Sequence, residues 1–123
     1  MQMFISKEFK FDAAHNLINY NGKCEKLHGH TYKLKVTLIG NISSNKNNSG
    51  MIIDFSLLKK IVDEKVIEVL DHNYINNIIQ QPTAENLIMW IWNILEKEFK
   101  SPNYELYELT LWETETSSVT LRK

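Results

Sequence analysis

Apolar and polar side chains alternate along residues 3–15 and again along residues 29–40. Alternation with a period of two predicts strands that bury one face. The expected buried positions are Phe9, Phe11, Ala13 and His15 in the first stretch, and His30, Tyr32, Leu34, Val36 and Leu38 in the second. We expect the two strands to pair as antiparallel neighbours.

After a polar stretch at residues 41–50, which predicts a loop, the apolar spacing changes to that of amphipathic helices. Asp54 can cap a first helix that ends near Leu70, and Thr83 can cap a second helix that begins after Pro82. The expected apolar positions are Phe55, Leu58, Ile61, Val62, Val66 and Val69 in the first helix, and Leu87, Ile91, Ile94, Leu95 and Phe99 in the second.

Alternation returns near the end of the chain. One face is expected to hold Tyr107, Leu109, Leu111 and Glu113, and Val119 and Leu121 mark a short last strand. The order β-β-α-α-β-β predicts an α+β fold in which two helices pack on one face of an antiparallel sheet. The length suits a single domain over residues 1–123.

Composition and charge narrow the function classes. The formal net charge of −1 gives no reason to expect nucleic acid or an acidic membrane surface as a partner. The single cysteine cannot form an internal disulfide, and the charged N-terminus, MQMFISKEFKFD, is unlike a signal peptide. The apolar runs are far shorter than the roughly 20 residues of a membrane span, so we expect a soluble cytoplasmic protein.

The histidines suggest a metal site. His28 and His30 lie two residues apart on a strand, so both imidazoles are expected to point to the same side. His15 ends the buried face of the first strand, and pairing of the strands would bring the three rings together. Three neutral imidazoles with an open fourth position are a catalytic zinc arrangement. The alternative is that His28 and His30 are ordinary surface histidines.

Cys24 stands four residues before His28, in a loop that enters the second strand. A thiol beside a cationic site can have a lowered pKa and act as a base or a nucleophile. Two alternatives stay open. Cys24 is an ordinary free cysteine, or it is a fourth zinc ligand that closes the site and makes it structural.

Two acidic positions also stand out. Asp71 follows the first helix, where a carboxylate is unfavourable against the helix dipole, so Asp71 and His72 are a candidate proton relay. The alternative is an ordinary helix end. Glu113 continues the apolar face of the third strand, and a carboxylate there needs a cationic or NH-rich partner. Alternatively, the strand ends before Glu113 and the side chain is solvated.

Taken together, these residues give the sequence a resemblance to the 6-pyruvoyltetrahydropterin synthase / 6-carboxytetrahydropterin synthase family over nearly the whole chain. The resemblance rests on FDAAH at 11–15, CEKLHGH at 24–30, GMIIDF at 50–55, LDHNYIN at 70–76, PTAEN at 82–86 and WETETS at 112–117. It implies the tunnelling fold, in which β-β-α-α-β-β units form trimers around a barrel of strands and two trimers stack into a homohexamer.

The resemblance also implies roles for the candidate residues. His15, His28 and His30 match the zinc ligands of the family, and Cys24 matches its catalytic cysteine. Asp71 and His72 match a catalytic pair that a neighbouring subunit contributes. Glu113 matches the glutamate that anchors the pterin, and Thr83 and Glu85 match the segment beside the pterin.

The spacing Cys-x-x-x-His-Gly-His resembles bacterial carboxytetrahydropterin synthases of the queuosine (7-deazaguanine) pathway. These zinc lyases form 6-carboxy-5,6,7,8-tetrahydropterin from 7,8-dihydroneopterin triphosphate. Glu25 overlaps a second pattern, Glu-x-x-His-Gly-His, found in relatives that cleave the side chain to 6-hydroxymethyl-7,8-dihydropterin for folate synthesis. Glu25 is therefore a secondary catalytic candidate. The alternatives are a 6-pyruvoyltetrahydropterin synthase, a non-catalytic zinc protein and a pterin-binding scaffold without turnover.

Overall fold

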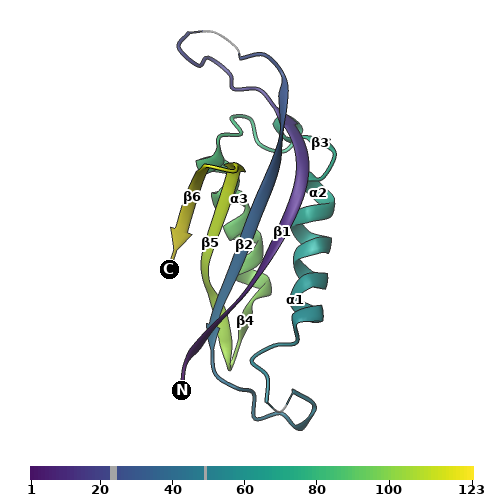
Figure 1. Cartoon of the computed structure of the whole chain (residues 1–123), viewed down its shortest axis with the longest axis vertical. Coiled ribbons are helices and arrows are strands. Elements are labelled where there is room, and N and C mark those ends of the chain that lie inside the picture. Colours follow the sequence, from purple (N-terminus) through teal and green to yellow (C-terminus); the bar gives the residue numbers. More distant parts are fainter. Residues whose placement is uncertain (23–24, 49) are drawn as a thin grey trace.

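The structure is a computed structural model that describes residues 1–22, 25–48 and 50–123. Figure 1 shows its elements, which in chain order are β1 (Met3–His15), β2 (His28–Gly40), a 3-10 turn (Lys46–Asn48), α1 (Phe55–Val62), a π-helical segment (Asp63–Ile67), α2 (Glu68–Leu70), β3 (Asn73–Tyr74), a 3-10 turn (Ile75–Asn77), α3 (Ala84–Glu98), β4 (Lys100–Ser101), β5 (Tyr104–Thr114) and β6 (Ser117–Arg122). The predicted order of long strands and helices is confirmed, with the short β3 and β4 in addition.

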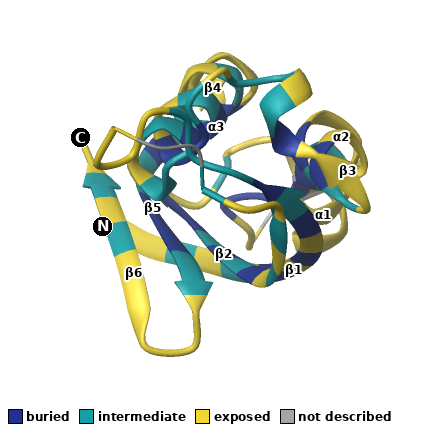
Figure 2. Ribbon diagram, turned by 90° about the horizontal axis from the view of Figure 1, so that it is seen from above, coloured by how far each residue is buried: buried dark blue, intermediate teal, exposed yellow. Residues whose placement is uncertain are grey.

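The strands form one sheet in the order β3-β1-β2-β5-β4, with β6 paired to β5. β1 and β2 are antiparallel as predicted, in a register that runs from Met3 opposite Gly40 to His15 opposite His28. β3 pairs with β1 in parallel, so the sheet is mixed rather than wholly antiparallel. The helices cover one face of this sheet, and the β5–β6 hairpin projects away from them (Figure 2).

Both predicted helix caps are present. The Asp54 carboxylate accepts the backbone N–H of Ser56 at 2.8 Å, and the Thr83 hydroxyl accepts that of Asn86 at 3.1 Å. These side chains satisfy backbone N–H groups that the first turn of a helix leaves without partners.

The first helical region departs from the predicted apolar stripe at its two ends. The expectation that Phe55 and Val69 are buried is wrong, because they are 54% and 38% exposed. The π-helical segment adds a residue to one turn, which rotates the end of the helix so that Val66 and Leu70 face the core. Phe55 lies three residues before the buried Leu58. This spacing places the two side chains about 60° apart around the helix axis, so Phe55 lies at the margin of the buried stripe.

The third long strand also differs from the expected alternation. Leu109 and Leu111 are buried as predicted, but the core position before them is Leu106 rather than Tyr107. The register between β2 and β5 shifts between Thr37 and Leu38, and such a bulge reverses the face that the following residues present. Tyr107 therefore packs against exposed Phe4, with ring centroids 4.8 Å apart.

One hydrophobic core joins the sheet to the helices. It contains Tyr32, Leu34 and Val36 of β2 and Leu87, Ile91 and Leu95 of α3, among other residues. No helix in the described part of the chain has the length and apolar composition needed to cross a bilayer. The sheet is therefore anchored by packing on one face, and its end at His15 and His28 is free to carry polar groups.

Candidate active site

Three histidines meet at the end of the β1–β2 pair. His15 lies directly opposite His28 in the strand register, and His30 follows two residues later on the same face. Their ligand atoms all lie within 4.8 Å of one another. The predicted convergence is confirmed, and His15 is only 2% exposed, so the three rings do not form an ordinary surface group.

The hydrogen bonds of the rings fix which nitrogen is free. Nδ1 of His15 lies 2.8 Å from the carbonyl oxygen of Pro82, and Nδ1 of His28 lies 2.8 Å from that of Lys26. A carbonyl oxygen can only accept, so each Nδ1 must carry the proton and each Nε2 keeps a free lone pair. Backbone acceptors of this kind commonly orient metal-binding histidines.

His30 completes the set of free nitrogens. Its Nε2 is buried and has no hydrogen-bond partner among the described residues. Burial lowers the pKa of His30 below its ordinary value of 6.5, an effect that the carboxylate of Glu113 partly opposes. A neutral ring with an unpartnered buried nitrogen is costly unless a ligand occupies that position. Three Nε2 donors facing one point are the ligand set expected for zinc.

Glu113 lies beside the histidines, on the face that the sequence predicted. Its two carboxylate oxygens are 4.0 Å from Nε2 of His15 and 3.9 Å from Nε2 of His30. β5 continues to Thr114, so the strand does not end before Glu113. The side chain is 29% exposed, which leaves the carboxylate accessible to a ligand.

Tyr32 contacts His15 from the core side of the site, a role that the sequence pattern did not predict. Its buried ring stacks on Phe11, and its hydroxyl lies 3.4 Å from Nδ1 of His15. Burial raises the pKa of the Tyr32 phenol well above its usual range, so the hydroxyl stays protonated. The signal in the sequence is its position two residues after His30, which places Tyr32 on the same buried face as the histidine.

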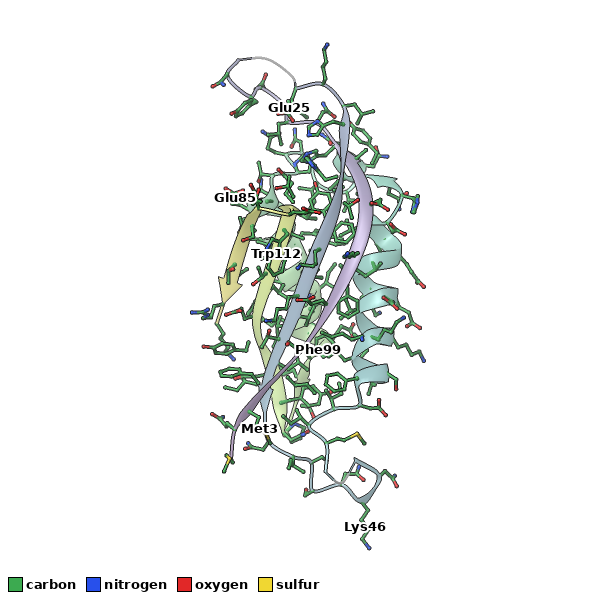
Figure 3. The ribbon with its side chains drawn as sticks, in the orientation of Figure 1. Met3, Glu25, Lys46, Glu85, Phe99 and Trp112 are labelled. Atoms are coloured by element: carbon green, nitrogen blue, oxygen red, sulfur yellow. The ribbon has the colours of Figure 1, made fainter. Side chains whose placement is uncertain are left out.

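The loop between His15 and His28 carries two catalytic candidates. Cys24 lies outside the described residues, so its predicted role as base or ligand stays a prediction. Glu25 is described, and its carboxylate lies 3.6 Å from Nε2 of His28. Glu25 and Glu85 lie toward the same end of the molecule, far from Met3 and Lys46 (Figure 3).

Asp71 and His72 form a close pair at the edge of β1. The Asp71 carboxylate accepts the backbone N–H of Asp12 at 2.9 Å, and its other oxygen lies 3.0 Å from Nδ1 of His72. These two contacts, led by the bond from Asp12, hold the pKa of Asp71 below its ordinary value. His72 has a left-handed backbone, with φ of 59°, and its side chain is 79% exposed.

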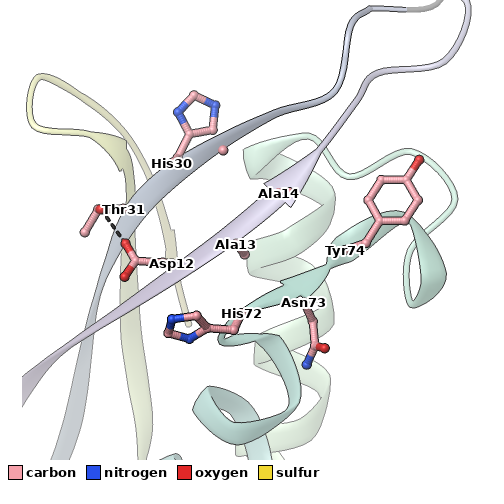
Figure 4. A pocket seen from close by; sticks show the side chains of 9 residues that line it. Asp12, Ala13, Ala14, His30, Thr31, His72, Asn73 and Tyr74 are labelled. Carbon is pink, nitrogen blue, oxygen red and sulfur yellow. Dashed lines mark hydrogen bonds between the residues drawn. The ribbon is translucent and has the colours of Figure 1, made fainter.

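The structure does not bring this pair to the histidines of the same chain. His72 lines a hollow that His30 also lines, together with Asp12, Thr31 and Tyr74, but the rings of His30 and His72 lie on opposite sides of β1 (Figure 4). Thr31 donates its hydroxyl to Asp12 across the strands. The Asp71–His72 pair is therefore accessible at the surface, and its role in a neighbouring subunit stays a prediction.

The two remaining candidates flank the start of α3. Thr83 follows Pro82, whose carbonyl holds His15, and its side chain caps the helix. Glu85 is exposed in the first turn. The structure thus places Thr83 next to the histidine group and leaves the carboxylate of Glu85 in solvent.

Comparison with known proteins identifies the family. A sequence profile described as 6-pyruvoyl tetrahydropterin synthase matches residues 4–123. The chain belongs to this family. A 6-carboxy-5,6,7,8-tetrahydropterin synthase of Haemophilus influenzae is 36% identical over 92% of this chain and 94% of the relative. A dihydroneopterin monophosphate aldolase of Pyrococcus furiosus is 40% identical over 84% of this chain and 82% of the relative.

Solved structures agree in fold. A 6-pyruvoyl tetrahydropterin synthase of Caenorhabditis elegans superposes with a TM-score of 0.80 at 24% identity, covering 100% of this chain and 96% of that one. A Plasmodium vivax protein of the same name gives a TM-score of 0.79 at 23% identity, with 100% and 98% covered. The predicted α+β tunnelling fold is confirmed.

Proposed function

We propose that the protein is a zinc-dependent lyase of queuosine biosynthesis. It would convert 7,8-dihydroneopterin triphosphate and water into 6-carboxy-5,6,7,8-tetrahydropterin, acetaldehyde and triphosphate. The observation that carries this proposal is the convergence of the ligand nitrogens of His15, His28 and His30 with the Glu113 carboxylate beside them. The Haemophilus influenzae relative, named for this product, supports it.

The histidines fit zinc in number and in chemistry. Neutral imidazole nitrogens suit this ion, and three protein ligands leave a fourth position for substrate. Bound there, zinc would act as a Lewis acid toward the side-chain hydroxyls of the substrate. Tyr32 and the carbonyls of Pro82 and Lys26 would keep the rings in their ligand orientation.

Glu113 would bind the guanidine-like N–H edge of the pterin. A carboxylate accepts two such bonds at once, and charge-assisted pairs are stronger than neutral ones. Thr83 and Glu85 would lie beside the ring. This assignment explains why a carboxylate continues the apolar face of Leu109 and Leu111.

Proton transfer would fall to Cys24, Asp71 and His72. Cys24 as a thiolate would take a proton from the substrate side chain, and the Asp71–His72 pair would return protons. The lowered pKa of Asp71 keeps its carboxylate ionised beside His72. The outward position of the pair supports its contribution to the site of a neighbouring subunit.

A homohexamer is part of the proposal. In the described sheet, residues 3–12 of β1 pair with β2 along one edge and have no strand on the other. In the same way, β6 pairs with β5 along one edge, so both outer edges of the described sheet are open. Edge-to-edge pairing of β1 with β6 of the next subunit would close a ring. A cytoplasmic location and a single domain over residues 1–123 stay predictions, the latter supported by the one core.

Side-chain cleavage to 6-hydroxymethyl-7,8-dihydropterin is the second candidate function. The Glu25 carboxylate, 3.6 Å from Nε2 of His28, favours it, as does the Pyrococcus furiosus relative. The aldehyde released separates the two reactions. Trapping with dinitrophenylhydrazine should yield the acetaldehyde derivative, whereas cleavage between the first two side-chain carbons would release a phosphorylated glycolaldehyde. Release of triphosphate without an aldehyde would indicate a 6-pyruvoyltetrahydropterin synthase, and release of neither would indicate a non-catalytic zinc or pterin-binding protein.

A further inference from the structure

Two side-chain amides hold the chain where it leaves the sheet after His15. Asn76 accepts the backbone N–H of Asn16 at 3.0 Å and donates to the carbonyl of the same residue at 2.8 Å. Gln81 makes the same pair of bonds with Ile18, at 2.7 Å and 3.0 Å. Four hydrogen bonds therefore fix the first three residues of the loop that leads to His28.

These amides continue an edge of the sheet. β3 pairs in parallel with β1 only at Ala13 and Ala14, and the bonds to Asn16 and Ile18 follow at alternate residues. Alternate residues of an extended chain direct their backbone N–H and C=O groups to the same side. A carboxamide is the side-chain group that both accepts and donates in one plane, so Asn76 and Gln81 replace the strand partner that β3 no longer supplies.

The amides are themselves firmly placed. Asn76 follows Ile75, which is fully buried in the core. The carbonyl of Gln81 accepts the side-chain N–H of Asn86 at 2.9 Å, and the next residue, Pro82, holds the ring of His15. One short segment thus fixes both a metal-ligand candidate and the loop that follows it.

One backbone hydrogen bond connects the residues that the amides hold to Glu25, near the other end of the loop. The N–H of Glu25 donates to the carbonyl of Leu17 at 2.8 Å, and Leu17 lies between the two residues that the amides hold. Glu25 in turn lies 3.6 Å from Nε2 of His28. Movement of Leu17 would therefore displace Glu25 relative to the three histidines.

We propose that Asn76 and Gln81 are positioning residues, which hold the part of the loop that follows His15 so that the carboxylate of Glu25 is presented at the metal site. The consequence for turnover rests on the proposed function. The consequence for the loop itself does not, because it depends only on the hydrogen bonds that the N–H of Ile18 donates to Gln81 and that the N–H of Glu25 donates to Leu17.

The test uses the full-length zinc-loaded protein and the variants Gln81→Ala, Gln81→Glu and Gln80→Ala. Amide hydrogen exchange is followed by NMR, alongside zinc content and steady-state kinetics with dihydroneopterin triphosphate. In Gln81→Ala the amides of Ile18 and of Glu25 should both exchange about tenfold faster, the order expected from loss of a hydrogen bond. Zinc content should stay unchanged, because a backbone carbonyl holds His15, and the rate of 6-hydroxymethyl-7,8-dihydropterin formation, the reaction assigned to Glu25, should fall about tenfold or more.

The other two variants serve as controls. Gln81→Glu has the same shape and keeps the acceptor for Ile18 but loses the donor, so its amide exchange should lie between those of wild type and Gln81→Ala. Gln80 is exposed and next in sequence, and Gln80→Ala should behave as wild type. The isosteric Asn76→Asp, compared with Asn77→Asp, provides the same test at the other amide if Gln81→Ala does not fold.

Three results would overturn the proposal. The first is faster exchange at Ile18 without faster exchange at Glu25, and the second is faster exchange at both with an unchanged rate of 6-hydroxymethyl-7,8-dihydropterin formation. The third is loss of zinc from Gln81→Ala. A wild-type protein that does not turn over the pterin would contradict the proposed function instead. In that case, coupled exchange at Ile18 and Glu25 would still support the positioning of the loop, and uncoupled exchange would overturn it.

Discussion

His15 and His28 turn their Nε2 atoms toward each other at a separation of 3.1 Å. Two nitrogens bound to one tetrahedral zinc at 2.0–2.1 Å would lie about 3.3 Å apart. The two rings therefore already have nearly the spacing of zinc ligands. Two hydrogen-bonded imidazoles would need a proton between them, but the carbonyls of Pro82 and Lys26 place both protons on the Nδ1 atoms. A cation bound by both Nε2 atoms would account for their short separation.

Replacement of one histidine should empty the metal site. His28→Ala leaves two nitrogen ligands, which make a poor zinc site, and we expect its zinc affinity to fall strongly. Metal analysis after dialysis measures this directly. His72→Ala is the matched control, because His72 lies outside the three-histidine group and should retain the metal. Full zinc retention in His28→Ala would refute the assignment.

The stability of the metal-free protein should depend on pH through His30. The pKa of His30 is lowered by burial, so the unfolded chain takes up this proton more readily than the folded one. The contribution of His30 to the free energy of unfolding should therefore not change with pH above the unfolded value near 6.5, and should make the protein less stable as pH drops from there through the folded pKa. Urea unfolding between pH 7.5 and 5 should show a shallower fall in His30→Gln. Identical slopes would contradict a lowered pKa.

Loss of the Glu113 charge should weaken pterin binding without loss of zinc. Charge-assisted hydrogen bonds contribute roughly 1.5–3 kcal/mol, so kcat/KM of Glu113→Gln should fall by about 10- to 150-fold. Glu115→Gln is the matched control, since Glu115 is exposed in the turn between β5 and β6. Equal kinetics in wild type and Glu113→Gln would show that Glu113 has no contact with the substrate.

Variants of Glu25 and of Cys24 should differ in the pterin product that they lose. Adjacent side chains of an extended segment diverge, so we expect each to serve a different reaction. Glu25→Ala should still form the carboxy product and lose any 6-hydroxymethyl side product. Cys24→Ala should keep its zinc and lose carboxy product, as chromatography of the pterins would show. Loss of zinc from Cys24→Ala would instead make Cys24 a ligand and the site structural.

Periodicity was enough to predict the strand pair that builds the site. Once residues 3–15 and 29–40 are antiparallel, a buried His15 must meet the face of His28 and His30. Glu113 also lies on the predicted face, beside His15 and His30, although the β5–β6 register shifts between Trp112 and Thr114. In both cases local spacing determines the face, and the register follows from pairing of the buried faces.

The errors arose where the backbone departs from regular geometry. Because of the bulge opposite Thr37 and Leu38, Leu106 and not Tyr107 occupies the core position. The π-helical segment rotates the helix so that Val69 is exposed. Neither inserted residue leaves a clear mark in a hydrophobic pattern. The amides of Asn76 and Gln81 were not predictable, because their partners, Asn16 and Ile18, are about 60 residues away in sequence. Such pairs depend on the tertiary fold.

The most direct test of the account is the identity of the pterin product. Zinc-loaded protein is incubated with 7,8-dihydroneopterin triphosphate, and the pterins are identified by mass spectrometry with authentic standards. The account predicts 6-carboxy-5,6,7,8-tetrahydropterin as the main product, with an equimolar amount of triphosphate. A main product of 6-hydroxymethyl-7,8-dihydropterin that persists in Cys24→Ala would contradict it and make the protein a side-chain-cleaving enzyme of folate synthesis.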